Sequence, residues 1–253
     1  RGMWEEFARV LPRIWTEEIV SHEGKYYQIP PRQVLPKPLQ KPHPPLWSAC
    51  SSEETTRTAA ALGLGALVGS EGGPDKVGNV LQLHQKMLKT ANPAGGLVNH
   101  HNALMTAGFC HEDAKEVEGR GTELISWYMD QQRDRARLVW QDVDPATVPP
   151  DYQGYYERDM KLAAGPHPGD ATASEIVKRG TSFCVGTPGQ CIKFFESYEA
   201  MGVEQVFLLS AIGPATHEEV MNTLTMFGKH VIPHFRAKEK VHASSGAPPV
   251  SSD

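Results

Sequence analysis

The chain has 253 residues, of which 40% are hydrophobic and 22% are charged. This composition is that of a globular domain rather than a disordered or fibrous chain. The formal net charge is -5 and no long basic run occurs, so binding to nucleic acid or to an anionic membrane is not expected. Because the sequence has no bilayer-length apolar stretch, no signal peptide at its start and no C-x-x-C pair, we expect a cytoplasmic protein with buried, reduced thiols.

The first fifth of the chain is expected to form a helix, a hairpin and an extended crossing. Apolar residues recur at helical spacing over residues 3–16, and Pro12 is expected to bend or shorten this helix. Residues 22–30 have the pattern of a short hairpin with Gly24 in its turn. Seven prolines between 30 and 45 exclude a regular ladder, which predicts an extended surface segment.

Apolar strands and amphipathic helices then alternate along the chain. Short connections between them are typical of parallel βαβ units and of an α/β fold. Four strands are counted, so either an open sheet or half of an eight-stranded (β/α)8 barrel would fit. The expected strands are 45–50, 65–69, one within 99–110, and 203–210; the expected helices are 53–62, 74–90, 188–201 and 216–230.

The region after residue 110 departs from this alternation. A helix beginning near His111 is expected to break around Gly119 and Gly121. The polar stretch 142–172 is too long for a simple connection, and a short helix is expected over 173–179. The tyrosine-rich segment 152–161 suits either a lid over a flat ligand or a solvent-exposed amphipathic helix.

A cluster of hydroxyl residues follows the strand at 45–50 and is the first candidate site. In a parallel sheet, functional groups lie at the carboxyl ends of the strands, where Ser51 and Ser52 occur. Ser52 can cap the helix that starts at Glu53, and Thr55 lies in its first turn. Such a helix end can bind a phosphate, although Glu53 and Glu54 would repel one. On the residues alone, a plain helix cap is the favoured interpretation.

Other candidate groups point to no particular chemistry. His230 and His234 have metal-like spacing, but Pro233 lies between them and no acidic ligand is near, so no metal site is predicted. His111 follows a strand and can either reach a substrate or act at a helix start. No Ser-His-Asp order and no pair of catalytic carboxylates is evident, so no catalytic residue is named.

Several segments, taken together, resemble the luciferase-like flavin-dependent monooxygenases and their deazaflavin-using relatives. The segments are EGKYYQIP, VLPKPLQKPHPPLWSACSSEETTRTAAALGLG, VGTPGQCIKFFESYEAMGVEQVFLL and HEEVMNTLTMFGKHVIPHFR. The resemblance implies a parallel (β/α)8 TIM-barrel fold, of which this chain supplies about the last four β/α units. The expected organisation is therefore a C-terminal part of such a barrel over 1–236, with an insertion at about 120–180 and a disordered tail at 237–253.

The resemblance also implies an activity. It implies that reduced FMN and O2 oxidise a small organic substrate, with the flavin phosphate held by Ser51, Ser52 and Thr55. A separate flavin reductase and a homodimer are the implied partners. The alternatives are hydride transfer with the deazaflavin coenzyme F420, or a non-catalytic or truncated relative. The family's contacts to the flavin ring lie mainly in the first half of the barrel, which these residues do not include.

Overall fold

The structure is a computed structural model that describes residues 2–164, 175, 177 and 182–244. The chain divides into two compact units, each described by itself below. Unit 1 comprises Arg1–Gly69, Asp75–Met105 and Ala200–Phe207, and unit 2 comprises Ser70–Pro74, Thr106–Glu199 and Leu208–Asp253. Of the helix predicted at 173–179, only residues 175 and 177 are among the described residues. The last part of the predicted tail, 245–253, lies wholly outside them.

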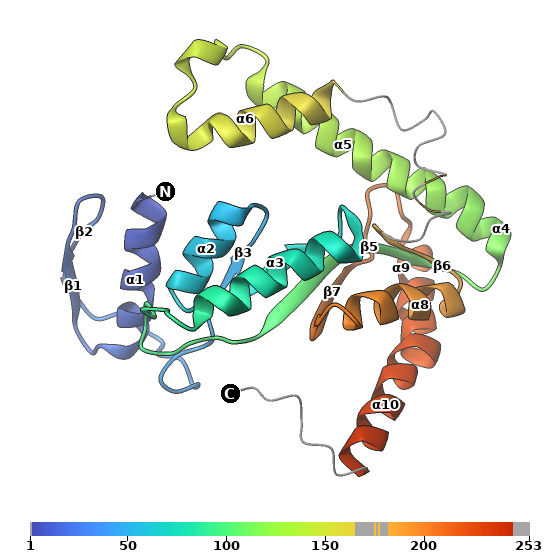
Figure 1. Ribbon diagram of the computed structural model, residues 1–253, viewed down its shortest axis with the longest axis horizontal. Helices are drawn as coiled ribbons and strands as arrows, with labels where there is room; N and C mark the ends of the chain where they lie inside the picture. Colours follow the sequence, from blue (N-terminus) through green and yellow to red (C-terminus); the bar gives the residue numbers. More distant parts are fainter. Residues whose placement is uncertain (1, 165–174, 176, 178–181, 245–253) are drawn as a thin grey trace. The chain divides into compact units, whose positions relative to one another are not determined.

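Unit 1 begins with α1 (Gly2–Thr16), followed by the antiparallel pair β1 (Val20–Glu23) and β2 (Gln28–Arg32) (Figure 1). The predicted helix and hairpin are thus confirmed, and α1 runs through Pro12. Glu6 joins the helix to the hairpin, because its carboxylate accepts hydrogen bonds from the backbone N–H groups of Tyr26 and Tyr27. These bonds lie at 3.1 and 2.9 Å.

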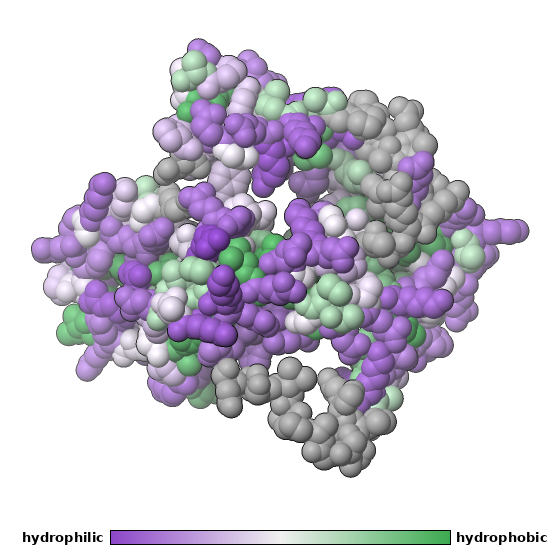
Figure 2. Space-filling model, viewed as in Figure 1, coloured by the Kyte–Doolittle hydropathy of each residue, from purple (hydrophilic) through white to green (hydrophobic). Residues whose placement is uncertain are grey.

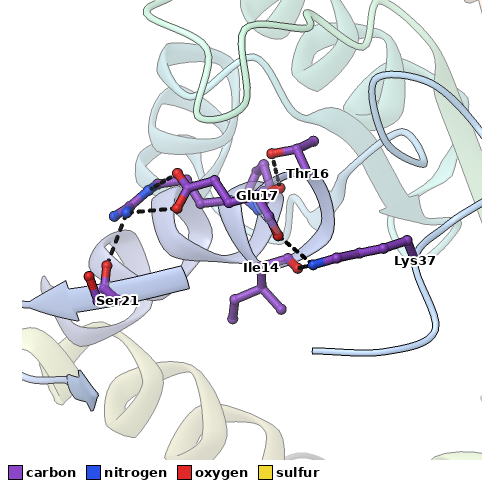
Figure 3. Close-up of polar contacts among 7 residues, drawn as sticks. Ile14, Thr16, Glu17, Ser21 and Lys37 are labelled. Carbon is purple, nitrogen blue, oxygen red and sulfur yellow. Dashed lines mark hydrogen bonds and ion pairs between the residues drawn. The ribbon is translucent and has the colours of Figure 1, made fainter. Parts of the chain in front are cut away.

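The proline-rich segment is attached to the end of α1 by Lys37. Its Nζ donates to the carbonyl oxygens of Ile14 at 2.8 Å and Glu17 at 2.6 Å (Figure 3). The last carbonyl groups of a helix have no partner within the helix, so a cation there satisfies them and complements the helix dipole. Beside it, Arg13 binds both carboxylate oxygens of Glu17 and the carbonyl of Ser21.

The sheet of unit 1 is parallel. Strand β3 (Trp47–Ala49) pairs with β4 (Gly65–Gly69), which pairs with the first half of β5 (Asn102–Cys110). Helix α2 (Glu53–Ala61) connects β3 to β4, and α3 (Gly73–Leu88) follows β4. The buried apolar side chains of this part come from α2, α3, the strands and the connection between α2 and β4, and include Ala59, Ala60, Leu62, Leu64, Ala66, Val77, Leu81, Ala103 and Leu104.

Strand β5 continues into unit 2, where its second half pairs in parallel with β6 (Cys184–Gly186). Strand β7 (Gln205–Leu209) also pairs with β5. The sheet among the described residues is therefore five-stranded, and the expected count of four is wrong because β6 was missed. With three residues, β6 is too short to show an alternating pattern.

The segment after β5 is helical for most of its length. It contains α4 (Ala114–Glu116), a π-helical turn η1 (Val117–Gly121), α5 (Thr122–Trp140), the 3-10 turn η2 (Pro145–Thr147) and α6 (Pro150–Ala163). A break was expected around Gly119 and Gly121, but the helix continues through both residues, which lie in the π turn. Helices α5 and α6 pack against each other, and the described part of the stretch expected as a long connection, residues 142–164, is mostly helical.

One hydrophobic cluster holds unit 2 together. It joins the sheet to η1 and α5 and includes Ile212, from the connection after β7. Its buried members are Ala107, Phe109, Val117, Leu124, Ile125, Val177, Phe183, Val185 and Ile212. Burying side chains of this size stabilises a fold by about 1.5–3 kcal/mol each.

Helix α8 (Pro188–Glu199) precedes β7, and α9 (His217–Met226), η3 (Phe227–Val231) and α10 (Ile232–Ser244) end the described chain. A second π turn, η3, links α9 to α10 without a break, so the helix predicted to end at 230 continues to Ser244. It therefore extends past Ala237, where a disordered tail was expected to begin.

Within the described residues, no helix combines the length and the apolar character that a bilayer crossing requires. On the face shown in Figure 2, hydrophilic residues predominate and hydrophobic residues gather in smaller groups among them. Scattered surface apolar groups of this kind are ordinary for a folded chain.

Candidate functional site

The corner between β3 and α2 in unit 1 carries the hydroxyl residues that the sequence predicts as a site. Ser51 and Ser52 are exposed, and Thr55 is half-buried in the first turn of α2. Ser52 has extended backbone angles, φ -140° and ψ 162°, as an N-cap residue requires. The structure thus brings all three predicted residues to the amino end of one nine-residue helix.

Ser52 and Thr55 form a capping box. Ser52 Oγ accepts from the backbone N–H of Thr55 at 3.2 Å, and Thr55 Oγ1 accepts from the N–H of Ser52 at 3.0 Å. Thr55 Oγ1 also lies 3.0 Å from the carbonyl oxygen of Ser52, to which its own hydrogen can be donated. The Ser52 hydroxyl hydrogen can then point either to Thr55 Oγ1, 3.1 Å away, or out of the helix end. A capping box typically stabilises a helix by about 1 kcal/mol.

The acidic residues of this corner bear on whether an anion can bind there. Arg57 donates from both Nε and Nη2 to Glu53 Oε1, at 3.0 and 2.6 Å. This pair draws the Glu53 carboxylate along the helix towards its next turn and offsets its charge. Part of the negative charge at this helix end is thereby offset, while the exposed Glu54 and the dipole of α2 act on an anion in opposite directions.

The other sequence candidates lie elsewhere. His111 Nδ1 accepts from the N–H of Asp113 at 3.1 Å, and its ring is stacked on Phe109, which fits a helix-start role. His234 Nε2 lies 3.0 Å from Glu196 Oε1, and the helix that carries His234 continues to Ser244. Among the described residues, no group of three or more His, Cys, Asp or Glu side chains is arranged to hold a metal ion.

The tyrosine-rich segment forms α6, which fits the interpretation of this segment as a solvent-exposed amphipathic helix. The ring of Tyr155 lies 5.3 Å from the Arg158 guanidinium, which also forms an ion pair with Asp159. Asp159 accepts from the indole N–H of Trp140 on α5 at 3.0 Å, and these bonds lower its pKa despite burial, which acts to raise it. The hydrogen bond from Trp140 to Asp159 therefore fastens α6 to α5, whereas the contacts of Tyr155 and Arg158 lie within α6.

A polar centre that sequence analysis missed lies in unit 2. Arg120, in the π turn η1, donates from Nε to Glu219 Oε1 at 2.7 Å and from Nη2 to Glu219 Oε2 at 3.2 Å. The same Nη2 donates to the carbonyl oxygen of Pro214 at 2.8 Å, and Nη1 lies 2.8 Å from Glu123. The hydrogen bond from Arg120 lowers the pKa of Glu219 to about 2, and the N–H of Thr216 contributes to this shift.

Comparison with known proteins identifies the family. A model of the luciferase-like monooxygenase family matches residues 1–205. The FMNH2-dependent dimethylsulfone monooxygenase of Pseudomonas putida is 25% identical over 244 residues, which cover 93% of this chain and 58% of that protein. The chain thus spans less than two thirds of the length of this relative.

Solved structures show the same fold. A monooxygenase from Streptomyces bottropensis superposes with a TM-score of 0.63 at 21% identity, over 91% of this chain and 60% of that one. The coenzyme F420-dependent tetrahydromethanopterin reductase of Methanopyrus kandleri gives a TM-score of 0.58 at 17% identity, over 92% and 62%. These likenesses confirm the parallel (β/α)8 TIM-barrel type expected of the α/β chain. With the family model covering most of its residues, this chain belongs to the luciferase-like monooxygenase family.

Proposed function

We propose that the protein is a flavin-dependent monooxygenase that uses reduced FMN and O2 to oxidise a small organic substrate. The observation that carries the proposal is the match of the luciferase-like monooxygenase model to residues 1–205. The relative from Pseudomonas putida, which is named as FMNH2-dependent, supports FMN as the cofactor. A cytoplasmic location, a homodimer and a separate flavin reductase that supplies reduced FMN are parts of the same proposal.

The phosphate of FMN binds, in this proposal, at the corner formed by Ser51, Ser52 and Thr55. The residues fit such a group, because an anion at the end of α2 can accept from first-turn N–H groups and from the Ser52 hydroxyl. The exposure of Ser51 and Ser52 leaves the helix end accessible. The pairing of Glu53 with Arg57 removes part of the repulsion that the sequence suggested.

The protein's contribution is to bind and orient the cofactor and to exclude water, while reduced flavin supplies the electrons for oxygen chemistry. The capping box has a positioning role, because it fixes the direction of the Ser52 side chain before any ligand arrives. A preorganised donor loses little conformational freedom on binding, which favours affinity.

Titration of the full-length protein with three ligands tests the proposal. FMN, riboflavin and coenzyme F420 are added separately, and the change in their fluorescence is followed. We expect FMN to bind more tightly than riboflavin, which lacks the phosphate, and more tightly than coenzyme F420. Preference for coenzyme F420 would instead favour the alternative of hydride transfer with this coenzyme, on which a reductase and a dehydrogenase among the structural neighbours are named as dependent. Binding of none of the three would contradict both functions.

A further inference from the structure

The connection after β7, residues 210–216, is exposed and yet fastened at several points. Ala211, Gly213 and Pro214 are exposed, whereas Ile212 between them is 1% exposed and belongs to the core of unit 2. Within the loop, the N–H of Ala215 donates to the carbonyl of Ile212 at 2.9 Å. We call residues 210–216 the β7 loop.

Two residues of the helical segment after β5 set the course of the β7 loop. Gly213 has a φ of +46°, and a Cβ at this position would overlap the ring of Trp127. Arg120 binds the carbonyl of Pro214 and, through Glu219, the end of the loop, because Glu219 Oε2 accepts from the N–H of Thr216 at 2.7 Å. A single guanidinium therefore fixes both the middle and the end of the β7 loop.

Close packing of the π turn on the sheet places Arg120. A Cβ on Gly121 would lie 2.7 Å from Val185 Cγ1 and 3.2 Å from Phe109 Cδ1, so only glycine permits this approach. Gly119, two residues earlier, would meet no atom within 4 Å. π turns inside α-helices are rare and frequently occur at functional sites. The turn is thus held against β5 and β6 with its arginine directed to the β7 loop.

We infer that the β7 loop binds the organic substrate and that Arg120 is its positioning residue. This inference rests on the proposed monooxygenase function. In (β/α)8 barrels the loops at the carboxyl ends of the strands carry the functional groups, and the β7 loop follows such an end. A binding loop must be accessible and rigid, which is the combination that the contacts of Ile212, Trp127 and Arg120 produce.

The charges around the β7 loop disfavour an anionic substrate. Arg120 is shared between Glu219 and Glu123, so one positive charge faces two carboxylates. The exposed loop residues Ala211, Gly213 and Pro214 carry no charge. An anionic substrate would therefore meet no net attraction here, whereas a small neutral molecule would lose little hydration free energy on leaving water.

The test compares Arg120→Met and Arg120→Lys with a matched control, Arg13→Met. Arg13 makes the same kinds of contact in unit 1, with both oxygens of Glu17 and with the carbonyl of Ser21. The probes are dimethyl sulfone, which is neutral, and methanesulfonate, an anion of similar size. Steady-state oxidation by the full-length protein, supplied with reduced FMN and O2, gives KM and kcat. Amide hydrogen exchange of residues 210–216 and the affinity for FMN are measured on the same proteins.

In the wild-type protein we expect oxidation of dimethyl sulfone and not of methanesulfonate. In Arg120→Met, exchange in the β7 loop and KM for dimethyl sulfone should each rise at least tenfold, with kcat and FMN affinity within about threefold. For Arg120→Lys, the exchange rate and KM should lie between those of the wild type and Arg120→Met. For Arg13→Met, both should match the wild type. Unchanged KM in Arg120→Met, an equal effect in Arg13→Met, or preference for methanesulfonate would overturn the inference alone. Wild-type protein that binds no FMN would overturn the proposed function and the inference with it.

Discussion

Replacement of Ser52 by aspartate separates a phosphate site from a plain helix cap. Aspartate caps a helix about as well as serine, so α2 should remain folded. An anion hydrogen-bonded to the same helix end would lie roughly 5 Å from the new carboxylate. At that distance two unit charges repel by about 1–3 kcal/mol for an effective dielectric constant between roughly 80 and 20. FMN should therefore bind about fivefold to about a hundredfold more weakly.

The assay is a fluorescence titration of FMN and of riboflavin against Ser52→Asp, with Thr58→Asp as the control. Thr58 lies on the same helix, and its substitution adds the same charge away from the amino end. Of the four combinations of ligand and variant, only the binding of FMN to Ser52→Asp should be weaker than in the wild type. This loss of affinity should shrink as ionic strength rises. Equal affinity of wild type and Ser52→Asp for FMN, or an equal loss for riboflavin, would refute the assignment of the phosphate to this corner.

Three further predictions concern stability. Gly121→Ala should destabilise the protein by about 1–3 kcal/mol in urea unfolding because its Cβ meets the sheet, whereas Gly119→Ala should be neutral or stabilising by up to about 1 kcal/mol. Lys37→Met, which leaves the carbonyls of Ile14 and Glu17 at the end of α1 without their cation, should lower stability by about 1–3 kcal/mol, and Lys25→Met should change it by less than about 0.5 kcal/mol. Because the pKa of Glu219 falls from 4.5 to about 2 on folding, its contribution is present above pH 4.5 and is lost as pH falls towards 2. Acid unfolding of Glu219→Gln should therefore be less steep in that range than that of the wild type.

The sequence predicted most elements because their signals are local. The strand at 65–69 was placed at its observed bounds, and the helices after Ser52 and Thr187 were placed to within two residues. Their caps and apolar periodicity lie within a few residues of one another. By contrast, β6 has three residues and gains its identity only by pairing with β5, which is 74 or more residues away in sequence.

The candidate site divides in the same way. Ser52 as the cap of α2, with Thr55 in its first turn and Ser51 beside it, was anticipated from the sequence, whereas the reciprocal bond from the Ser52 N–H to Thr55 Oγ1 is a finding of the structure. The contact of Arg120 with Glu219 joins residues 99 positions apart, and no local sequence pattern predicts it. The capping box of Thr216 and Glu219 has a readable T-x-x-E pattern, which marks the start of α9 but says nothing about the arginine.

The four cysteines have a practical consequence for following the β7 loop in solution. All four are free and buried. Burial raises the pKa of the Cys50 thiol to about 11, and a hydrogen bond with Cys191 together with burial raises that of Cys110. Thiol-directed dyes react with the thiolate, so the native cysteines should react slowly at neutral pH. A cysteine introduced at exposed Ala211 would then be the preferred point of attachment, and a dye there would report movement of the β7 loop as substrate is added.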